Sequence, residues 1–220
     1  MPPVAADAAL EPGGLPASVL AVPEIRDYQR LNAALAALLD AGSRRVVLSG
    51  AEGQRLLASG LSGPWRAVVE VEGWAGPELA AGLNAPGLTV VCRGQAADGA
   101  GGGLRDGRLI VLGEAGAGAG YAQRGGSIVV AGDCGPRAGL NQSGGVLVLL
   151  GRVGILGGER QSGGHLYVSS GHAGAHPGRG RRGGRFVEVA AMANRLDGSD
   201  PGADEVLRAV LDDARPWLTG

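Results

Sequence analysis

Apolar residues in the middle of the chain gather in short runs that are separated by glycines. Side chains two positions apart lie on one face of a β-strand. The second and fourth positions of the runs are apolar except at Glu188, so we expect strands whose second and fourth columns face a core. Aligned on the glycines, the expected strands are Val68–Glu72, Thr89–Arg93, Arg108–Leu112, Ser127–Ala131, Val146–Leu150, His165–Ser169 and Arg185–Val189.

Glycines recur ahead of these runs with the spacing G-x-x-G-x-x-x-G. The unit length is 19 residues from Gly94 to Gly151 and 20 residues from Gly151 to Gly171. Glycine reaches positive φ and allows two backbones to approach closely, so these positions are predicted to be corners. The corner glycines are Gly113, Gly116, Gly120, Gly132, Gly135, Gly139, Gly151, Gly154 and Gly158.

The length of the unit predicts the fold class. A unit this short has room for one strand but not for the crossover helix of a βαβ fold. One strand cannot bury its apolar face alone, whereas stacked units line the columns up into a continuous core. We therefore predict an all-β fold, a parallel β-solenoid of about seven coils over residues 46–190.

The N-terminal part of the chain lacks the repeat. Residues 1–23 are rich in alanine and proline, and we expect a poorly ordered arm. Apolar residues at a spacing of three to four predict a helix over residues 24–41, with Pro23 and Gly42 as its boundaries. Residues 24–45 would then form the helix and lead-in to the solenoid.

A second helix is predicted near the C-terminus. Asp200 and Pro201 have the character of an N-cap and a first helical residue, ahead of an apolar stripe over about 202–214. The end of a solenoid exposes unpaired strand edges that need a cover. We therefore expect residues 191–220 to cap the C-terminal end of the stack.

The third column of the strands is apolar too, although alternation directs it outward. Soluble monomers rarely expose large apolar patches, so either a helix of this chain or a docked partner must cover this column. Both alternatives remain open from the sequence. The candidate docking residues, called the outer ladder below, are Val91, Ile110, Val129, Val148 and Tyr167.

Composition narrows the class of protein further. The chain has 220 residues, 43 glycines and a net charge of −1, which gives no overall field for nucleic acid or an anionic membrane. Its two cysteines fit a reducing compartment. No apolar run reaches the ~18 residues of a membrane span, and no basic segment precedes the apolar start. We expect a cytoplasmic protein.

Candidate chemistry is sparse. The segment Gly116–Gly120 would need a following helix to hold a nucleotide phosphate, and a strand follows instead. His165, His172 and His176 lie within 12 residues, yet no helix or acidic neighbour completes a zinc site. Cys92 falls in an inward column and Cys134 at a corner. We expect no catalytic, cofactor-binding or metal site in this chain.

One charged cluster breaks the pattern at the end of the repeat. Arg179, Arg181 and Arg182 follow one another closely, and Arg185 opens the last expected strand. Guanidinium groups bind carboxylates and phosphates well. We take the first three, called the basic end below, as candidate partner-docking residues, with a solvated loop as the alternative.

The repeat resembles a known family. Segments such as Gly132-Asp-Cys-Gly-Pro-Arg-Ala-Gly-Leu-Asn-Gln-Ser-Gly-Gly145 are similar to the GXGXG domain, over about Val46 to Val189. That domain closes the large subunit of glutamate synthase. It also forms a separate GXGXG subunit in formylmethanofuran dehydrogenase and in the related formyltransferase/hydrolase complex. The helix with Leu31-Asn-Ala-Ala-Leu35 resembles the lead-in of stand-alone glutamate-synthase-like subunits.

The resemblance implies a right-handed parallel β-helix with a structural role. We therefore expect a non-catalytic scaffold subunit of a glutamate-synthase-like oxidoreductase complex. Its protein partners would be a glutamine amidotransferase and a synthase subunit with FMN and an iron–sulfur cluster. FMN and the iron–sulfur cluster would lie in those partners. The alternative is the GXGXG subunit of a formylmethanofuran dehydrogenase or formyltransferase/hydrolase-type complex. Neither implies a nucleic-acid or membrane partner.

Overall fold

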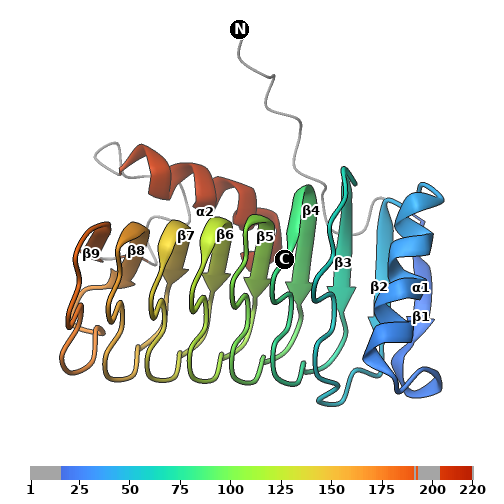
Figure 1. Cartoon of the computed structure of the whole chain (residues 1–220), viewed down its shortest axis with the longest axis horizontal. Coiled ribbons are helices and arrows are strands. Elements are labelled where there is room, and N and C mark those ends of the chain that lie inside the picture. The colour runs from blue at the N-terminus through green and yellow to red at the C-terminus, as the bar shows by residue number, and fades with distance from the viewer. Residues whose placement is uncertain (1–15, 191, 193–203, 220) are drawn as a thin grey trace, which may run out of the picture.

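The structure is a computed structural model that describes residues 16–190, 192 and 204–219. The described strands form one nine-stranded parallel sheet in sequence order, wound as a solenoid (Figure 1). This confirms the predicted fold class. The elements are β1 (Ser18–Ala21), η1 (Val22–Glu24), α1 (Tyr28–Asp40), β2 (Arg45–Ser49), β3 (Ala67–Val71), β4 (Asn84–Cys92), β5 (Asp106–Val111), β6 (Arg124–Val130), β7 (Ser143–Leu149), β8 (Gly163–Ser169), β9 (Arg185–Val189) and α2 (Glu205–Leu218).

The register of the sheet places equivalent residues of successive units side by side. Ile110 pairs with Val129, and Val129 pairs with Val148. The inward columns meet in one long core inside the solenoid, and the expectation for these columns is confirmed. Glu188 is exposed and Phe186 half-buried, so both columns end in the last coil. Fully buried members of the columns are Val69, Val90, Leu109, Ile128, Leu147 and Leu166.

The glycines of the repeat have two structural roles, which depend on their position in the unit. The third glycine of a unit turns the chain: Gly120 and Gly139 have φ of +67° and +68°. The first glycine allows contact between coils, since a Cβ on Gly132 would lie 2.7 Å from the backbone carbon of Gly113. A real Cβ does not come that close to backbone, so the coil spacing itself excludes a side chain there.

The N-terminal segment differs from the expectation. Residues 18–21, assigned above to a poorly ordered arm, form β1 and pair in parallel with β2; residues 1–15 lie outside the described part. The helix α1 begins at Tyr28 rather than near residue 24, because Asp27 is its N-cap and accepts a hydrogen bond from the Arg30 backbone N–H at 2.9 Å. Pro23 belongs to the preceding η1 turn instead.

The helix α1 packs at the N-terminal end of the solenoid (Figure 1). Leu31, Leu35 and Leu39 enter the interior core. Asn32 fixes the helix to a turn of the first coil, since its amide donates to the Leu56 carbonyl oxygen at 2.8 Å and accepts from the backbone N–H of Ala58 at 2.9 Å. This helix therefore covers the end that the first coil would otherwise leave open.

The helix α2 is not the end cap that the sequence suggested. It runs along the outer face of the sheet and packs against β6 and β7 (Figure 1). It starts at Glu205 with Asp204 as N-cap, and the expected cap Asp200 and Pro201 lie outside the described residues. The described part of the chain contains no helix with the length and apolarity needed to cross a membrane.

Replacing Gly151 with alanine is expected to lower the free energy of unfolding by about 2 kcal/mol, because overpacking against rigid atoms is costly. The added Cβ would lie 2.5 Å from the backbone carbon and oxygen of Gly132. Urea denaturation followed by circular dichroism measures the change. In the control Gly157→Ala, the nearest atom is the Val153 side-chain Cγ1 at 3.3 Å. Equal losses in the two variants would contradict the role assigned to backbone contact.

Candidate functional site

The outer ladder lies under α2. Its five side chains are at most 2% exposed, and they form a second apolar cluster with the inner face of the helix. The sequence left two covers open, a helix of this chain or a docked partner; the structure shows the helix, so the hypothesis that these residues dock a partner is corrected. The helix side chains in this cluster are Leu207, Val210, Leu211, Ala214 and Trp217.

Charged contacts hold α2 along its length. At its start, the Asp204 carboxylate accepts from the Val206 backbone N–H and pairs with Arg185 at 2.7 Å. Burial opposes ionisation of Asp204, but this N–H, the nearby Tyr167 hydroxyl and the Arg185 guanidinium together outweigh it and lower its pKa. Further along, Asp213 pairs with Arg108 on β5 at 2.8 Å. The helix is thus tied to two separate strands.

Tyr167 closes the ladder near the start of α2. It is fully buried, and its hydroxyl makes no hydrogen bond of ordinary geometry within the described residues. Burial, followed by the nearby Asp204 carboxylate, raises the pKa of the phenol to about 12. Tyr167 therefore stays neutral near pH 7, and its ring stacks on His165 with 6.0 Å between the ring centroids.

A buried carboxylate occupies the ladder column beyond the other end of α2. Glu70 is 3% exposed and pairs with Arg45 and Arg93, both at 2.6 Å. Burial alone would raise the pKa of Glu70, but the two guanidiniums hold it below its usual value. Arg93 also lies over the ring of Trp217, 5.5 Å from its centroid. This network joins β2, β3 and the residue that follows β4 to the last turn of the helix.

A column of three glutamines runs through the interior. Gln123, Gln142 and Gln161 are 0% exposed. The Gln142 amide donates to the Gln123 side-chain oxygen at 3.0 Å, and the Gln161 amide donates to the Gln142 oxygen at 2.9 Å. This glutamine ladder was missed from the sequence, although the three residues recur at the 19-residue period. The hydrogen bonds of this ladder satisfy polar groups of the coil corners that lie close to the apolar core.

The histidines do not form a common site. His165 lies half-buried on β8, while His172 and His176 are exposed in the last coil. Within the described residues, no group of three histidine, cysteine or acidic side chains is placed to hold a metal ion. The His172 backbone carbonyl accepts from Val153, which shows this segment to be an ordinary part of the coil.

The two cysteines are core side chains. Cys92 and Cys134 are buried, and both lack a disulfide partner in the described structure. Burial raises the pKa of Cys92, and burial followed by the neighbouring Asp133 charge raises the pKa of Cys134 to about 12. The thiolate is the nucleophilic form, so both groups are held in their unreactive state.

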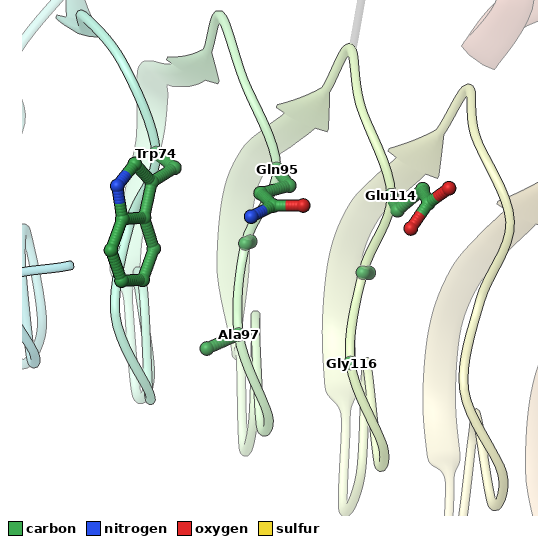
Figure 2. Close-up of a pocket in the computed structure, with 7 residues that line it drawn as sticks. Trp74, Gln95, Ala97, Glu114 and Gly116 are labelled. Carbon is green, nitrogen blue, oxygen red and sulfur yellow. The ribbon is translucent and has the colours of Figure 1, made fainter. Parts of the chain in front are cut away.

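A shallow pocket of about 240 Å³ lies on the outer surface where the coils turn back from the sheet. Figure 2 shows Trp74, Gln95 and Glu114 on three successive coils around it, with Ala97 and Gly116 beside them. Trp74 is 45% exposed and packs over Gly53, whose added Cβ would lie 2.2 Å from the ring. One aromatic face, one amide and one carboxylate can contact a ligand, but this lining offers no nucleophile.

The basic end is exposed, as the docking prediction requires. Arg179, Arg181 and Arg182 lie on the surface of the last coil, and none forms an ion pair with a described residue. Arg185, the neighbouring arginine, is instead occupied by Asp204. Of the two docking surfaces expected from the sequence, only this one remains accessible in the described structure.

Comparison of the chain with protein-family models, with curated proteins and with solved structures gives no match. The resemblance to the GXGXG domain therefore stays a prediction, and function must be inferred from the residues themselves.

The Glu70→Gln variant is expected to lose about 2 kcal/mol of unfolding free energy at pH 7, because two guanidiniums would then face a neutral amide at a buried position. The pKa of Glu70 is lowered from 4.5 on folding. Its contribution is thus complete above pH 4.5 and is lost as the pH falls through the folded-state pKa. Urea titrations across this range should show the two proteins converging. Exposed Glu72→Gln is the control, expected to match the wild type throughout.

Both thiols are expected to resist Ellman's reagent at about pH 8 in the native protein, since burial raises their pKa values. Unfolding in urea should release both of the chain's cysteines to the reagent. Rapid native reaction of Cys134 would show that its surroundings are more open than the structure indicates, and Cys134→Ala identifies the signal.

Proposed function

We propose that this chain is a non-catalytic scaffold subunit of a glutamate-synthase-like oxidoreductase complex in the cytoplasm. Its partners would be a glutamine amidotransferase and a synthase subunit that carries FMN and an iron–sulfur cluster. The observation that carries the proposal is the 19-residue glycine repeat, found here in a parallel solenoid in which corner glycines touch the neighbouring coil. This is the feature on which the resemblance to the GXGXG domain depends.

The energetics of the described residues support a scaffold. A scaffold must hold its shape while partners bind, and here interior and outer clusters bury the middle strands on both faces. Reactive groups are kept in inert states, since the thiols carry raised pKa values and Glu70 is doubly paired. Two surface features of the described residues are available for recognition, the basic end and the pocket beside Trp74.

The same repeat supports a second candidate, the GXGXG subunit of a formylmethanofuran dehydrogenase or formyltransferase/hydrolase-type complex. Fold alone does not separate the two, because both families would use the solenoid in the same way. The distinction lies in the chemistry of the partners: flavin and iron–sulfur cofactors in one case, a metal-dependent amidohydrolase in the other.

Purification of the tagged full-length chain from its own cells is expected to recover a flavin-bearing partner and an amidotransferase. Absorbance of the eluate at flavin wavelengths and mass spectrometry of the co-purified bands measure the outcome. An amidohydrolase-like partner would favour the second candidate instead. Recovery of the chain by itself, at the level of a tag-only control, would contradict the proposal of a complex subunit.

A further inference from the structure

The last coil differs in charge from the coils before it. The basic end adds three guanidiniums that form no ion pair with a described residue, and exposed His172 and His176 lie in the same coil. The carboxylate of this coil, Glu188, accepts a hydrogen bond from the Gly171 backbone N–H at 3.2 Å. It is therefore directed to the backbone of the coil and not to the basic end. In earlier coils the positive charge of arginine is better matched by carboxylates; Arg137, for example, pairs with Glu159 at 3.2 Å.

The glutamine ladder stops at this coil. Gln161 lies in a turn that is closed by its backbone N–H, which donates to the Gly158 carbonyl oxygen. The same turn recurs in the last coil, where the Arg181 backbone N–H donates to the Gly178 carbonyl oxygen. Arg181 thus takes the next position of the ladder, but it is exposed rather than inward. Earlier side-chain oxygens accept from the following coil, so the Gln161 Oε1 faces the last coil, and it has no hydrogen-bond partner among the described residues.

The sheet also ends here. β9 pairs with β8 on one side, and no described strand pairs with its other edge. An exposed edge strand is a template for a further strand from another chain. The half-buried Phe186 ends an inward column of the core beside this edge. The last coil therefore has a free sheet edge and a group of cations without an ion-pair partner among the described residues, and an unfilled buried acceptor faces it from the coil before.

We propose that the C-terminal end of the solenoid is a docking surface for an acidic protein segment that adds to the edge of β9. Its carboxylates would pair with the basic end, and its backbone would continue the sheet. A second copy of this chain docked tail to tail is disfavoured as the occupant, because that contact would bring two basic ends together. This inference rests on the proposed subunit role only in requiring a protein partner, and it identifies the surface and the charge of that partner.

The test uses the full-length chain and a fluorescein-labelled peptide of about ten residues with alternating glutamate and valine, a typical strand length and pattern. Fluorescence anisotropy at low salt should show binding that weakens as salt is added. The triple variant Arg179→Glu, Arg181→Glu and Arg182→Glu is expected to weaken it at least about tenfold, since three attractive pairs become repulsive.

A matched variant separates the basic end from net charge. Arg105→Glu, Arg124→Glu and Arg152→Glu make the same charge change at exposed arginines of earlier coils, and binding by this variant should stay within about twofold of wild type. Circular dichroism of both variants establishes that they are folded. Equal weakening in the two would overturn the proposal, because it would show general charge attraction.

Two further probes test the kind of partner. The acidic peptide with prolines at alternate positions cannot continue the sheet, so it should bind at least about tenfold more weakly. A single-stranded RNA of similar charge should also bind more weakly than the acidic peptide; tighter RNA binding would overturn the choice of a protein partner. Failure of every peptide arm removes this docking surface but leaves the scaffold proposal to the co-purification result.

Discussion

Contact between backbones of neighbouring coils is the constraint on which this structure depends. At the first glycine of the middle units, Gly94, Gly113, Gly132 and Gly151, the chain passes so close to the previous coil that a Cβ would meet backbone atoms at less than 3 Å. That contact sets the register, and the register lines the apolar columns into one core. The glutamine ladder follows from the same alignment, since equivalent side-chain amides can form hydrogen bonds only when neighbouring coils place them side by side.

The solenoid could be predicted from the sequence because its signal repeats. Each unit gives the same spacing of glycines and apolar residues, and only stacked coils bury that pattern. β1 was missed because Ser18–Ala21 is a single short strand without the glycine spacing, and only pairing with β2 defines it. The glutamine ladder was visible in principle, as three glutamines one period apart, but polar residues at corners are more often solvated turns.

The position of α2 could not be derived from its own sequence. An amphipathic helix carries one apolar stripe, and that stripe fits an open end or an outward apolar face equally well. The decision comes from residues elsewhere in the chain: Arg108, Arg185 and Arg93 lie where Asp213, Asp204 and Trp217 can meet them. The same reasoning explains why the outer ladder looked like a docking surface, since its cover comes from a distant part of the chain.

The helix over the outer ladder also limits the size of the molecule. A helix of 14 residues is about 21 Å long, and five ladder residues on successive strands span about 19 Å. The repeat by itself could accept another unit, because each coil contacts only its neighbours. An added coil between β5 and β8 would make the outer apolar face longer than α2. It would also move Arg108 away from Arg185, so that α2 could no longer pair with both. The length of the helix therefore fixes the number of coils beneath it.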